Sequence, residues 1–496
     1  MGQARDRQAL SSNHAPVIKE PDPKQEILRS SAIVGAGSLT NIFAGILKHK
    51  AIALILGPSG IGLFGLLNAI LSTAAAVSGM GLSSSGVREI AEAQARGDSF
   101  KMAATRRALT VSSYALGVFG ALILILFREP IAGLAMADQG ASRAVAWLGI
   151  GLWATVASGS QTALLNGLRR IGDLTWVNVI AAVAGLIVAV PAVWLWHEHG
   201  VLVAVIASPL ASLVAARLFA RRMRTGEVKP SLHALTEPLA KLFSLGFVFM
   251  LTALMTVGTQ LAIRVMVTRE LGIEATGHFQ AAWNISVLYL GVVLGAMGAD
   301  YFPRLTGVAG DVPASNKAMN EQAEVALLLS GPIILAMLTL TPWIVALLYS
   351  QAFLDTNAVL RWQVLGDIFK VASWSLGFLF LAQARRAVFF LMELAGNLVY
   401  LGCVWYGLAV WGLEATGIGF LICYVFYFFL VWMMARKLNR FVWGKRTCRL
   451  LVAVACCGFL VFFLRSIHPA VFLPVGLAFT LTLGGYSFRR VSRILS

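Results

Sequence analysis

Residues 56–64 read LGPSGIGLF, and residues 271–279 read LGIEATGHF. Both stretches follow the pattern LG-x4-G-x-F, so that position 56 of the first copy corresponds to position 271 of the second. Two glycines and a phenylalanine are shared in each copy: Gly57, Gly62 and Phe64 in the first, and Gly272, Gly277 and Phe279 in the second. A pattern that returns at such a distance indicates that one structural unit occurs twice.

Two shorter matches lie at nearly the same separation along the chain. Met80-Gly81 matches Met297-Gly298, and Arg169-Arg170 matches Arg385-Arg386. The three matches occur in the same order in both parts of the chain. Together they predict an internal duplication, which is typical of membrane transporters.

The composition excludes a water-soluble fold. Of the 496 residues, 58% are hydrophobic and only 13% are charged, whereas about 25% are charged in a typical soluble domain. The mean hydropathy is +0.78. Since about 20 consecutive apolar residues suffice to cross a bilayer, the long uncharged stretches of this chain predict transmembrane helices.

We expect an all-α polytopic membrane protein with about fourteen transmembrane helices. The predicted spans are 31–56, 63–84, 108–127, 145–168, 174–196, 201–219, 242–268, 280–301, 325–348, 362–384, 387–410, 415–434, 449–464 and 470–488.

Six spans separate the two copies of the repeat, so both copies enter the membrane in the same direction. This predicts two parallel six-helix bundles related by a pseudo-two-fold axis along the membrane normal, with the substrate path between them. The predicted segments are a polar tail (1–30), the first bundle (31–219), a cytoplasmic linker (220–241), the second bundle (242–434), a basic linker (435–448), two additional helices (449–488) and a basic tail (489–496).

The net charge of +17 reflects membrane topology. The chain has 40 Lys and Arg residues against 23 Asp and Glu residues, a balance that would favour nucleic-acid binding in a soluble protein. Here 31 of the 40 lie in loops and tails on the side of the N-terminus, and only five lie in loops on the other side. Because basic residues accumulate in cytoplasmic loops, we expect both termini in the cytoplasm and no nucleic-acid partner.

The four remaining basic residues lie inside predicted spans, where a charge costs roughly 2.5–3.5 kcal/mol on insertion scales. Such residues usually face a partner or a watery cavity, so we interpret them as substrate-binding candidates. Two polar neighbours complete the set, which consists of Lys48, His49, Lys50, Gln260, Arg264 and Lys370. By the repeat separation, His49 corresponds to Arg264.

Alternative roles remain open for these side chains. Lys48 and Lys50 point about 200° apart on a helix, so one of them could instead extend to the membrane interface. Arg264 could serve a structural role by binding neighbouring carbonyl groups. Lys370 could form an internal ion pair with Asp367, three residues earlier and on the same helical face.

Acidic residues at membrane depth are candidates for ion coupling or gating. They are Asp300, Asp367 and Glu393. Asp300, however, lies close enough to Arg304 to be an ordinary interface residue, and Glu393 could pair with Lys370. No nucleotide-binding P-loop and no metal-ligand spacing occurs in the sequence, so we expect no metal and no cofactor, with H⁺ and Na⁺ as candidate coupling ions.

The combination of these features resembles a known family. A basic first span ending in the 56–64 motif, its second copy at 271–279, and the run LNGLRR at 165–170 are similar to the O-antigen and polysaccharide repeat-unit flippases of the multidrug/oligosaccharidyl-lipid/polysaccharide exporter superfamily. The resemblance covers residues 27–440. Members typically have twelve spans, so the pair at 449–488 departs from the family pattern.

The resemblance implies an alternating-access flippase in the bacterial inner membrane, rather than an enzyme. Its substrate would be an undecaprenyl-diphosphate-linked oligosaccharide moved from the cytoplasmic to the periplasmic leaflet. A polysaccharide polymerase and a chain-length regulator are the candidate protein partners.

The diphosphate of such a substrate is anionic, which agrees with the basic residues inside the spans. We expect Arg264, with Lys50 or Lys48 and Lys370, to hold it. Two other functions stay open at this point: a multidrug or cation antiporter of the same superfamily, and an intramembrane polysaccharide polymerase or ligase.

Overall fold

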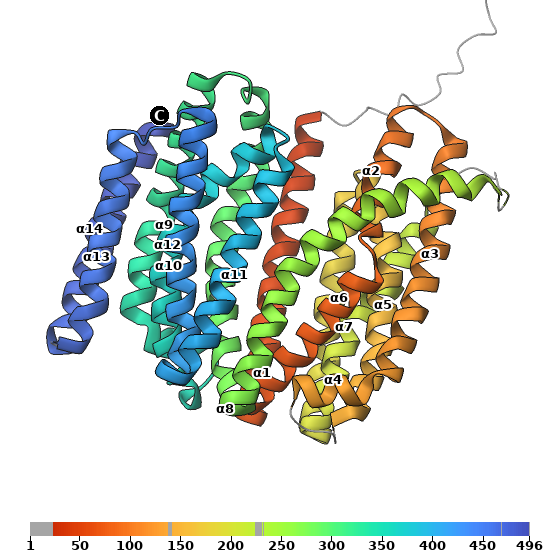
Figure 1. The fold of residues 1–496 in the computed structure, drawn as a ribbon, viewed down its shortest axis with the longest axis horizontal. Helices are drawn as coiled ribbons and strands as arrows, with labels where there is room; N and C mark the ends of the chain where they lie inside the picture. Colours follow the sequence, from red (N-terminus) through yellow and green to blue (C-terminus); the bar gives the residue numbers. More distant parts are fainter. Residues whose placement is uncertain (1–22, 137–140, 224–230, 232, 468, 496) are drawn as a thin grey trace, which may run out of the picture.

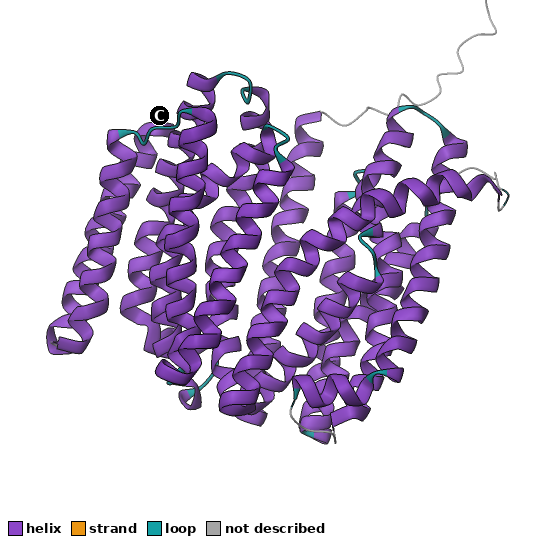
Figure 2. Ribbon diagram, viewed as in Figure 1, coloured by secondary structure: helices purple, strands orange, loops and turns teal. Residues whose placement is uncertain are grey.

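The computed structural model describes residues 23–136, 141–223, 231, 233–467 and 469–495. Within these ranges the chain is helical and contains no strand (Figure 2). Among the described residues, ten helical segments are long and apolar enough to cross a membrane. The predicted tail (1–30) and cytoplasmic linker (220–241) lie partly outside the described residues.

The described helices account for every predicted span. Two spans lie in α1, two in α8, and one in each of α3, α5, α6, α7 and α9 to α14, which confirms the polytopic all-α fold. The bounds are α1 Pro23–Ser78, α2 Leu82–Ala95, α3 Ser99–Leu126, α4 Arg128–Ala135, α5 Ser142–Gly167, α6 Ile171–Trp196, α7 Glu198–Arg221, α8 Thr236–Gly307, α9 Val312–Leu348, α10 Thr356–Ala382, α11 Arg386–Trp411, α12 Ala415–Asn439, α13 Lys445–Ile467 and α14 Pro469–Leu495.

The helices form two groups (Figure 1). Helices α2 to α7 lie in one group and α9 to α12 in the other, while α1 and α8 run between the groups. Helices α13 and α14 flank the second group at its far edge. The start of α1 and the end of α14 lie at the same end of the molecule, as an even number of crossings requires. We call this the terminal end and the opposite one the distal end.

The gap between the first and second predicted spans is not a loop, and neither is the gap between the seventh and eighth. Each contains a single non-helical glycine within a continuous helix: Gly57 in α1 (φ 66°, ψ −159°) and Gly272 in α8 (φ 88°, ψ 175°). Glycine adopts this positive φ at little cost because it has no Cβ. Pro58 follows Gly57 directly and suits the first turn of the next helical part. Each helix therefore turns back at its glycine (Figure 1).

Backbone angles confirm the duplication and correct its register. Arg169 (φ 56°) corresponds to Ala384 (φ 55°), and His197 (φ 49°) corresponds to Gly412 (φ 55°). Both pairs have the same separation along the chain as Gly57 and Gly272. The predicted match of Arg169 to Arg385 is therefore wrong by one position.

Met80-Gly81 and Met297-Gly298, which match in sequence, have different backbone conformations. Met80 and Gly81 have positive φ angles of 44° and 64° and separate α1 from α2. Met297 and Gly298 lie inside the continuous helix α8. The two groups of helices therefore differ at the terminal end.

The second glycines of the motif bring the two copies into direct backbone contact. A Cβ atom on Gly62 would lie 2.1 Å from the carbonyl oxygen of Ile273, and one on Gly277 would lie 1.9 Å from that of Pro58. Since Ile273 and Gly277 are the repeat equivalents of Pro58 and Gly62, the contact is reciprocal. It marks the pseudo-two-fold axis and holds the two groups together near the distal end.

A second close approach lies at the terminal end. A Cβ atom on Gly81 would lie 2.1 Å from the carbonyl oxygen of Gly246, and one on Gly246 would lie 2.4 Å from that of Met80. The beginning of α8 therefore packs against the turn between α1 and α2. In the second group, a Cβ atom on Gly298 would instead lie 3.3 Å from the ring of Trp374.

We expect Gly277→Ala to destabilise the protein, because the added methyl group would overlap the Pro58 carbonyl oxygen. Overpacking of this kind costs about 1–3 kcal/mol. The measurement is the thermal unfolding midpoint of the purified protein in detergent. Gly291→Ala is the control, because nothing lies within 4 Å of a Cβ atom there; equal midpoints for the two variants would contradict the proposed contact.

Candidate substrate-binding site between the two helix groups

The phenylalanines of the two motifs contact basic residues of α1 and α8. The rings of His49 and Phe64 are in edge contact, with 5.3 Å between their centroids. The guanidinium carbon of Arg264 lies 5.4 Å from the centroid of the Phe279 ring. Because His49 and Arg264 are repeat equivalents, as are the two phenylalanines, the same pair is built twice.

Arg264 is buried, with 5% of its surface exposed, and is held by amide groups. Its Nε donates to Oε1 of Gln280 at 2.7 Å. Its Nη1 donates to the backbone oxygen of Gln260 at 2.7 Å and to the Gln260 Oε1 at 2.9 Å. Among the described residues, no carboxylate forms an ion pair with it. The site therefore contains a buried positive charge that amide dipoles orient but do not neutralise.

A chain of hydrogen bonds runs from Arg264 into the wall of a cavity. Nε2 of Gln280 donates to Oδ1 of Asn284 at 2.7 Å, and Nδ2 of Asn284 donates to the hydroxyl of Tyr349 at 3.2 Å. Gln280 fits because Gly65 faces it: a Cβ atom there would lie 2.4 Å from the Gln280 Oε1. Sequence reasoning missed all three polar residues, although the spacing of Gln280 and Asn284 repeats that of Gln260 and Arg264.

The cavity has a volume of about 280 Å³ and lies between α1, the second part of α8 and the end of α9. Its wall combines hydrogen-bonding groups with an aromatic ring, and Oδ1 of Asn41 is buried without a partner in the described structure. The lining residues that the argument uses are Asn41, His49, Trp283, Asn284 and Tyr349.

Lys48 and Lys50 diverge, as their helical angle predicts. Nζ of Lys48 lies 5.1 Å from the centroid of the Phe64 ring, next to His49. Nζ of Lys50 donates to the backbone oxygen of Leu347 at 2.6 Å, in the last turn of α9. A cation is stabilised at a helix C-terminus by the helix dipole, so Lys50 joins α1 to α9.

Asp367 is fully buried in the second group. Its Oδ2 accepts hydrogen bonds from Ser286 at 2.9 Å and from the hydroxyl of Tyr289. Nζ of Lys370 lies 3.9 Å from its Oδ1, so the internal ion pair, one of the alternatives for Lys370, is formed. Both side-chain polar atoms of Gln363, one turn before Asp367, are buried without a partner among the described residues.

Lys370 is separated from Arg264 by aromatic rings. Its Nζ lies 5.5 Å from the centroid of Phe420 and 5.3 Å from that of Tyr424. Phe420 in turn contacts the cavity residue Trp283, with 6.0 Å between the ring centroids. No contact within the described part of the chain joins Lys370 to Arg264, so the predicted basic residues do not converge on one point in this conformation.

The other two acidic candidates lie apart from the cavity. Glu393 in α11 accepts a hydrogen bond from the hydroxyl of Tyr427 and forms no ion pair in the described structure. Asp300 is exposed near the end of α8 and pairs with Arg304 at 3.2 Å, which agrees with the interface reading. The described residues contain no group of three metal-ligating side chains.

Comparison with known proteins decides the family. The family described as "Polysaccharide biosynthesis protein" matches residues 27–308, which is more than half of the chain. The chain belongs to this family. Among curated relatives, the lipid III flippase of Escherichia coli (strain K12) is 22% identical over 435 residues, which cover 82% of this chain and 99% of that protein.

Solved structures of other transporters share the fold of this family member. The lipid II flippase MurJ, in an inward closed conformation, superimposes with a TM-score of 0.68 at 13% identity, over 94% of this chain and 99% of that one. An inward-facing multidrug resistance MATE family transporter of the MOP superfamily gives a TM-score of 0.65 at 16% identity, over 84% of this chain and 95% of that one. The chain is therefore a multi-pass membrane protein of the polysaccharide biosynthesis family, with the fold of these transporters.

We expect Tyr289→Phe to lower the free energy of unfolding, because it removes the hydroxyl that binds the buried Asp367 carboxylate. A hydrogen bond to a charged group contributes about 1.5–3 kcal/mol. The measurement is the thermal unfolding midpoint in detergent. Tyr406→Phe serves as the control, since that side chain is 69% exposed; if both variants unfold at the wild-type temperature, the bond to Asp367 does not stabilise the fold.

Proposed function

We propose that this protein flips an undecaprenyl-diphosphate-linked oligosaccharide from the cytoplasmic to the periplasmic leaflet of the bacterial inner membrane. Its membership of the polysaccharide biosynthesis family and the flippase names of its relatives support a lipid-linked sugar as the substrate. The observation that carries the proposal is the buried, unneutralised guanidinium of Arg264 beside a largely apolar cavity with a few polar groups, between the two helix groups.

Arg264 fits a diphosphate. A guanidinium offers a planar fork of N–H donors that matches two phosphate oxygens, and the attraction grows where water is excluded. Within the described structure, Gln280 and Gln260 occupy Nε and Nη1, and no hydrogen bond is formed by Nη2. The amides thus hold the guanidinium in place and leave donors for an anionic headgroup. Lys48 and His49 form the equivalent basic pair in the first copy of the repeat.

The cavity fits the sugar part of the same substrate. Asn41, His49, Asn284 and Tyr349 offer donors and acceptors for sugar hydroxyl groups, while Trp283 offers an apolar ring face. Binding sites for small ligands commonly combine an apolar surface with a few placed polar groups. The lipid tail would remain in the bilayer, because its burial in the protein would bring no gain over hydrocarbon.

The two glycine contacts support alternating access. The reciprocal contact of Gly62 and Gly277 joins the two copies near the distal end, and the contact of Gly81 with Gly246 joins them at the terminal end. With both termini in the cytoplasm, that end is the side where lipid-linked sugars are assembled. Opening toward the periplasm would require the contact of Gly62 with Gly277 to separate, and opening toward the cytoplasm would require the contact of Gly81 with Gly246 to separate.

Energy coupling would involve the acidic residues of the second group. Asp367 is the strongest candidate because it is buried beside Lys370 and borders the cavity-forming helix α8. Glu393 could take the same ion, H⁺ or Na⁺, at its bond with Tyr427, and the exposed Asp300 would act at the terminal mouth. Outward movement of an anion is itself favoured by about 2.3 kcal/mol per charge per 100 mV when the inside is negative, so coupling would mainly serve the return step.

The test is leaflet-resolved transport of a labelled undecaprenyl-diphosphate-linked oligosaccharide in vesicles containing the purified protein, with a labelled organic cation as a second substrate. We expect Gln280→Glu to reduce transport by about tenfold or more, equivalent to about 1.4 kcal/mol at least. The new carboxylate would keep the hydrogen bond to Arg264 while neutralising its charge. Arg264→Ala should have at least as large an effect.

The matched control is Gln351→Glu, the same substitution at an exposed position. Unfolding midpoints establish that Gln280→Glu is folded. Normal lipid transport by both Gln280→Glu and Arg264→Ala would overturn the role of Arg264. Transport of the organic cation in place of the lipid would favour the antiporter function. In that case a polysaccharide polymerase or a chain-length regulator would no longer be expected as a partner.

A further inference from the structure

Two arginines meet at the distal end, away from the cavity. Arg361 belongs to the second turn of α10 and Arg465 to the last turn of α13. Arg361 donates from Nη2 to the backbone oxygen of Phe462, and its guanidinium carbon lies 4.5 Å from the centroid of the Phe462 ring. The guanidinium carbon of Arg465 lies 5.8 Å from the centroid of Phe472. Both charges therefore lie against aromatic rings where α10, α13 and α14 come together.

The hydrogen-bonding capacity of this pair is not satisfied. Nε of Arg361 and Nη1 of Arg465 are both buried and have no acceptor among the described residues. The two positive charges also repel one another. A buried donor without an acceptor is costly, and more so when the group is charged. The arrangement therefore suits an anion.

Among the described residues, no neighbouring carboxylate supplies such an anion. The charge of Glu414 acts on Arg361, but its carboxylate accepts a hydrogen bond from Nε1 of Trp362 at 3.1 Å. It forms no ion pair with either arginine in the described structure. The C-terminus of α13 attracts cations as well, yet a helix dipole amounts to roughly half a charge, against two guanidinium groups.

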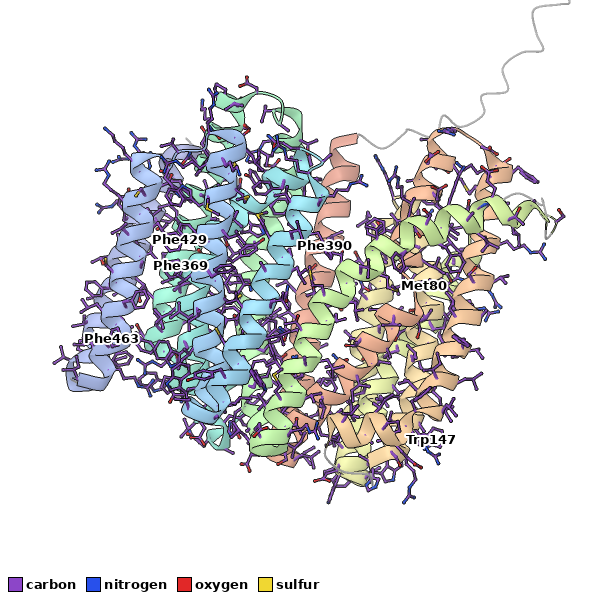
Figure 3. The ribbon with its side chains drawn as sticks, viewed as in Figure 1. Met80, Trp147, Phe369, Phe390, Phe429 and Phe463 are labelled. Atoms are coloured by element: carbon purple, nitrogen blue, oxygen red, sulfur yellow. The ribbon has the colours of Figure 1, made fainter. Side chains whose placement is uncertain are left out.

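We propose that Arg361 and Arg465 bind the phosphate of a membrane lipid in the leaflet at the distal end. Two guanidinium groups with free N–H donors suit the oxygens of a phosphate. A lipid is favoured over free phosphate because α13 also presents exposed apolar side chains at this level: Leu460, Phe463 and Ile467. Phe463 lies at the outer edge of the molecule (Figure 3), where an acyl chain can contact it.

The site differs from the transport site. It lies on α10 and α13, outside the residues that match the family, and its basic residues do not line the cavity. The proposal therefore does not depend on the substrate proposed above. A phosphate there would bind α13 and α14 to the second helix group, or would receive the headgroup of an exported lipid; the source of the phosphate decides between these roles.

The experiment is native mass spectrometry of the detergent-purified full chain with four probes: phosphatidylglycerol, undecaprenyl diphosphate, dioleoylglycerol and inorganic phosphate. We expect the wild type to retain the phosphate-bearing lipids at least tenfold more strongly than dioleoylglycerol. Arg465→Gln should abolish this preference for phosphatidylglycerol and, in an Arg264→Ala background that removes the proposed transport site, also for undecaprenyl diphosphate. It is the primary variant because Arg465 forms no hydrogen bond within the described structure, so its loss removes no structural bond.

Arg361→Gln should have the same effect, and Arg143→Gln, an exposed arginine of the first group, should have none. Retention of phosphatidylglycerol supports a bulk lipid site, and selective retention of undecaprenyl diphosphate supports a site for exported lipid. Wild-type retention by Arg465→Gln, or equal retention of dioleoylglycerol, would overturn the proposal. Displacement of both lipids by inorganic phosphate at equal concentration would overturn its lipid part.

Discussion

The contact between Gly62 and Gly277 is the constraint on which the arrangement of this protein depends. Each glycine lets a backbone carbonyl of the other copy approach to a distance that no side chain would allow. The contact forms only because Gly57 and Gly272 turn the two long helices back at equivalent points. It fixes the pseudo-two-fold axis, and it places the first turns of both returning helices, with Phe64 and Phe279, next to the path between the groups.

The duplication creates two equivalent positions, and sequence divergence gives them different chemistry. In the first copy, Phe64 contacts His49 and the adjacent Lys48, and the missing side chain of Gly65 leaves a space. In the second, Phe279 contacts Arg264, and Gln280 extends into the space left by Gly65. The buried charge therefore lies close to the axis with support from both copies. Such a placement suits a carrier, because both groups would contact the same headgroup while they move.

The family match at residues 27–308 does not extend to the last two helices. Arg361 and Arg465 link α10 to α13 through the Phe462 ring and backbone. Because α10 also carries Asp367 and Lys370, the added pair is attached to the helix that holds the candidate coupling residues. The distal attachment and the buried ion pair lie on the same helix, about two turns apart.

Apolar runs, basic loops and the internal repeat were sufficient to predict the all-α membrane fold, its fourteen spans and the equivalence of His49 and Arg264 in the repeat. These properties depend on local composition and on order along the chain, which the sequence states directly. The partners of Arg264 could not be predicted, since Gln280 reaches it only because a distant glycine, Gly65, leaves room. Likewise, Lys50 reaches α9 and Lys370 is held behind aromatic rings. Which buried polar groups meet is decided by the packing of helices far apart in sequence, and only the tertiary structure shows it.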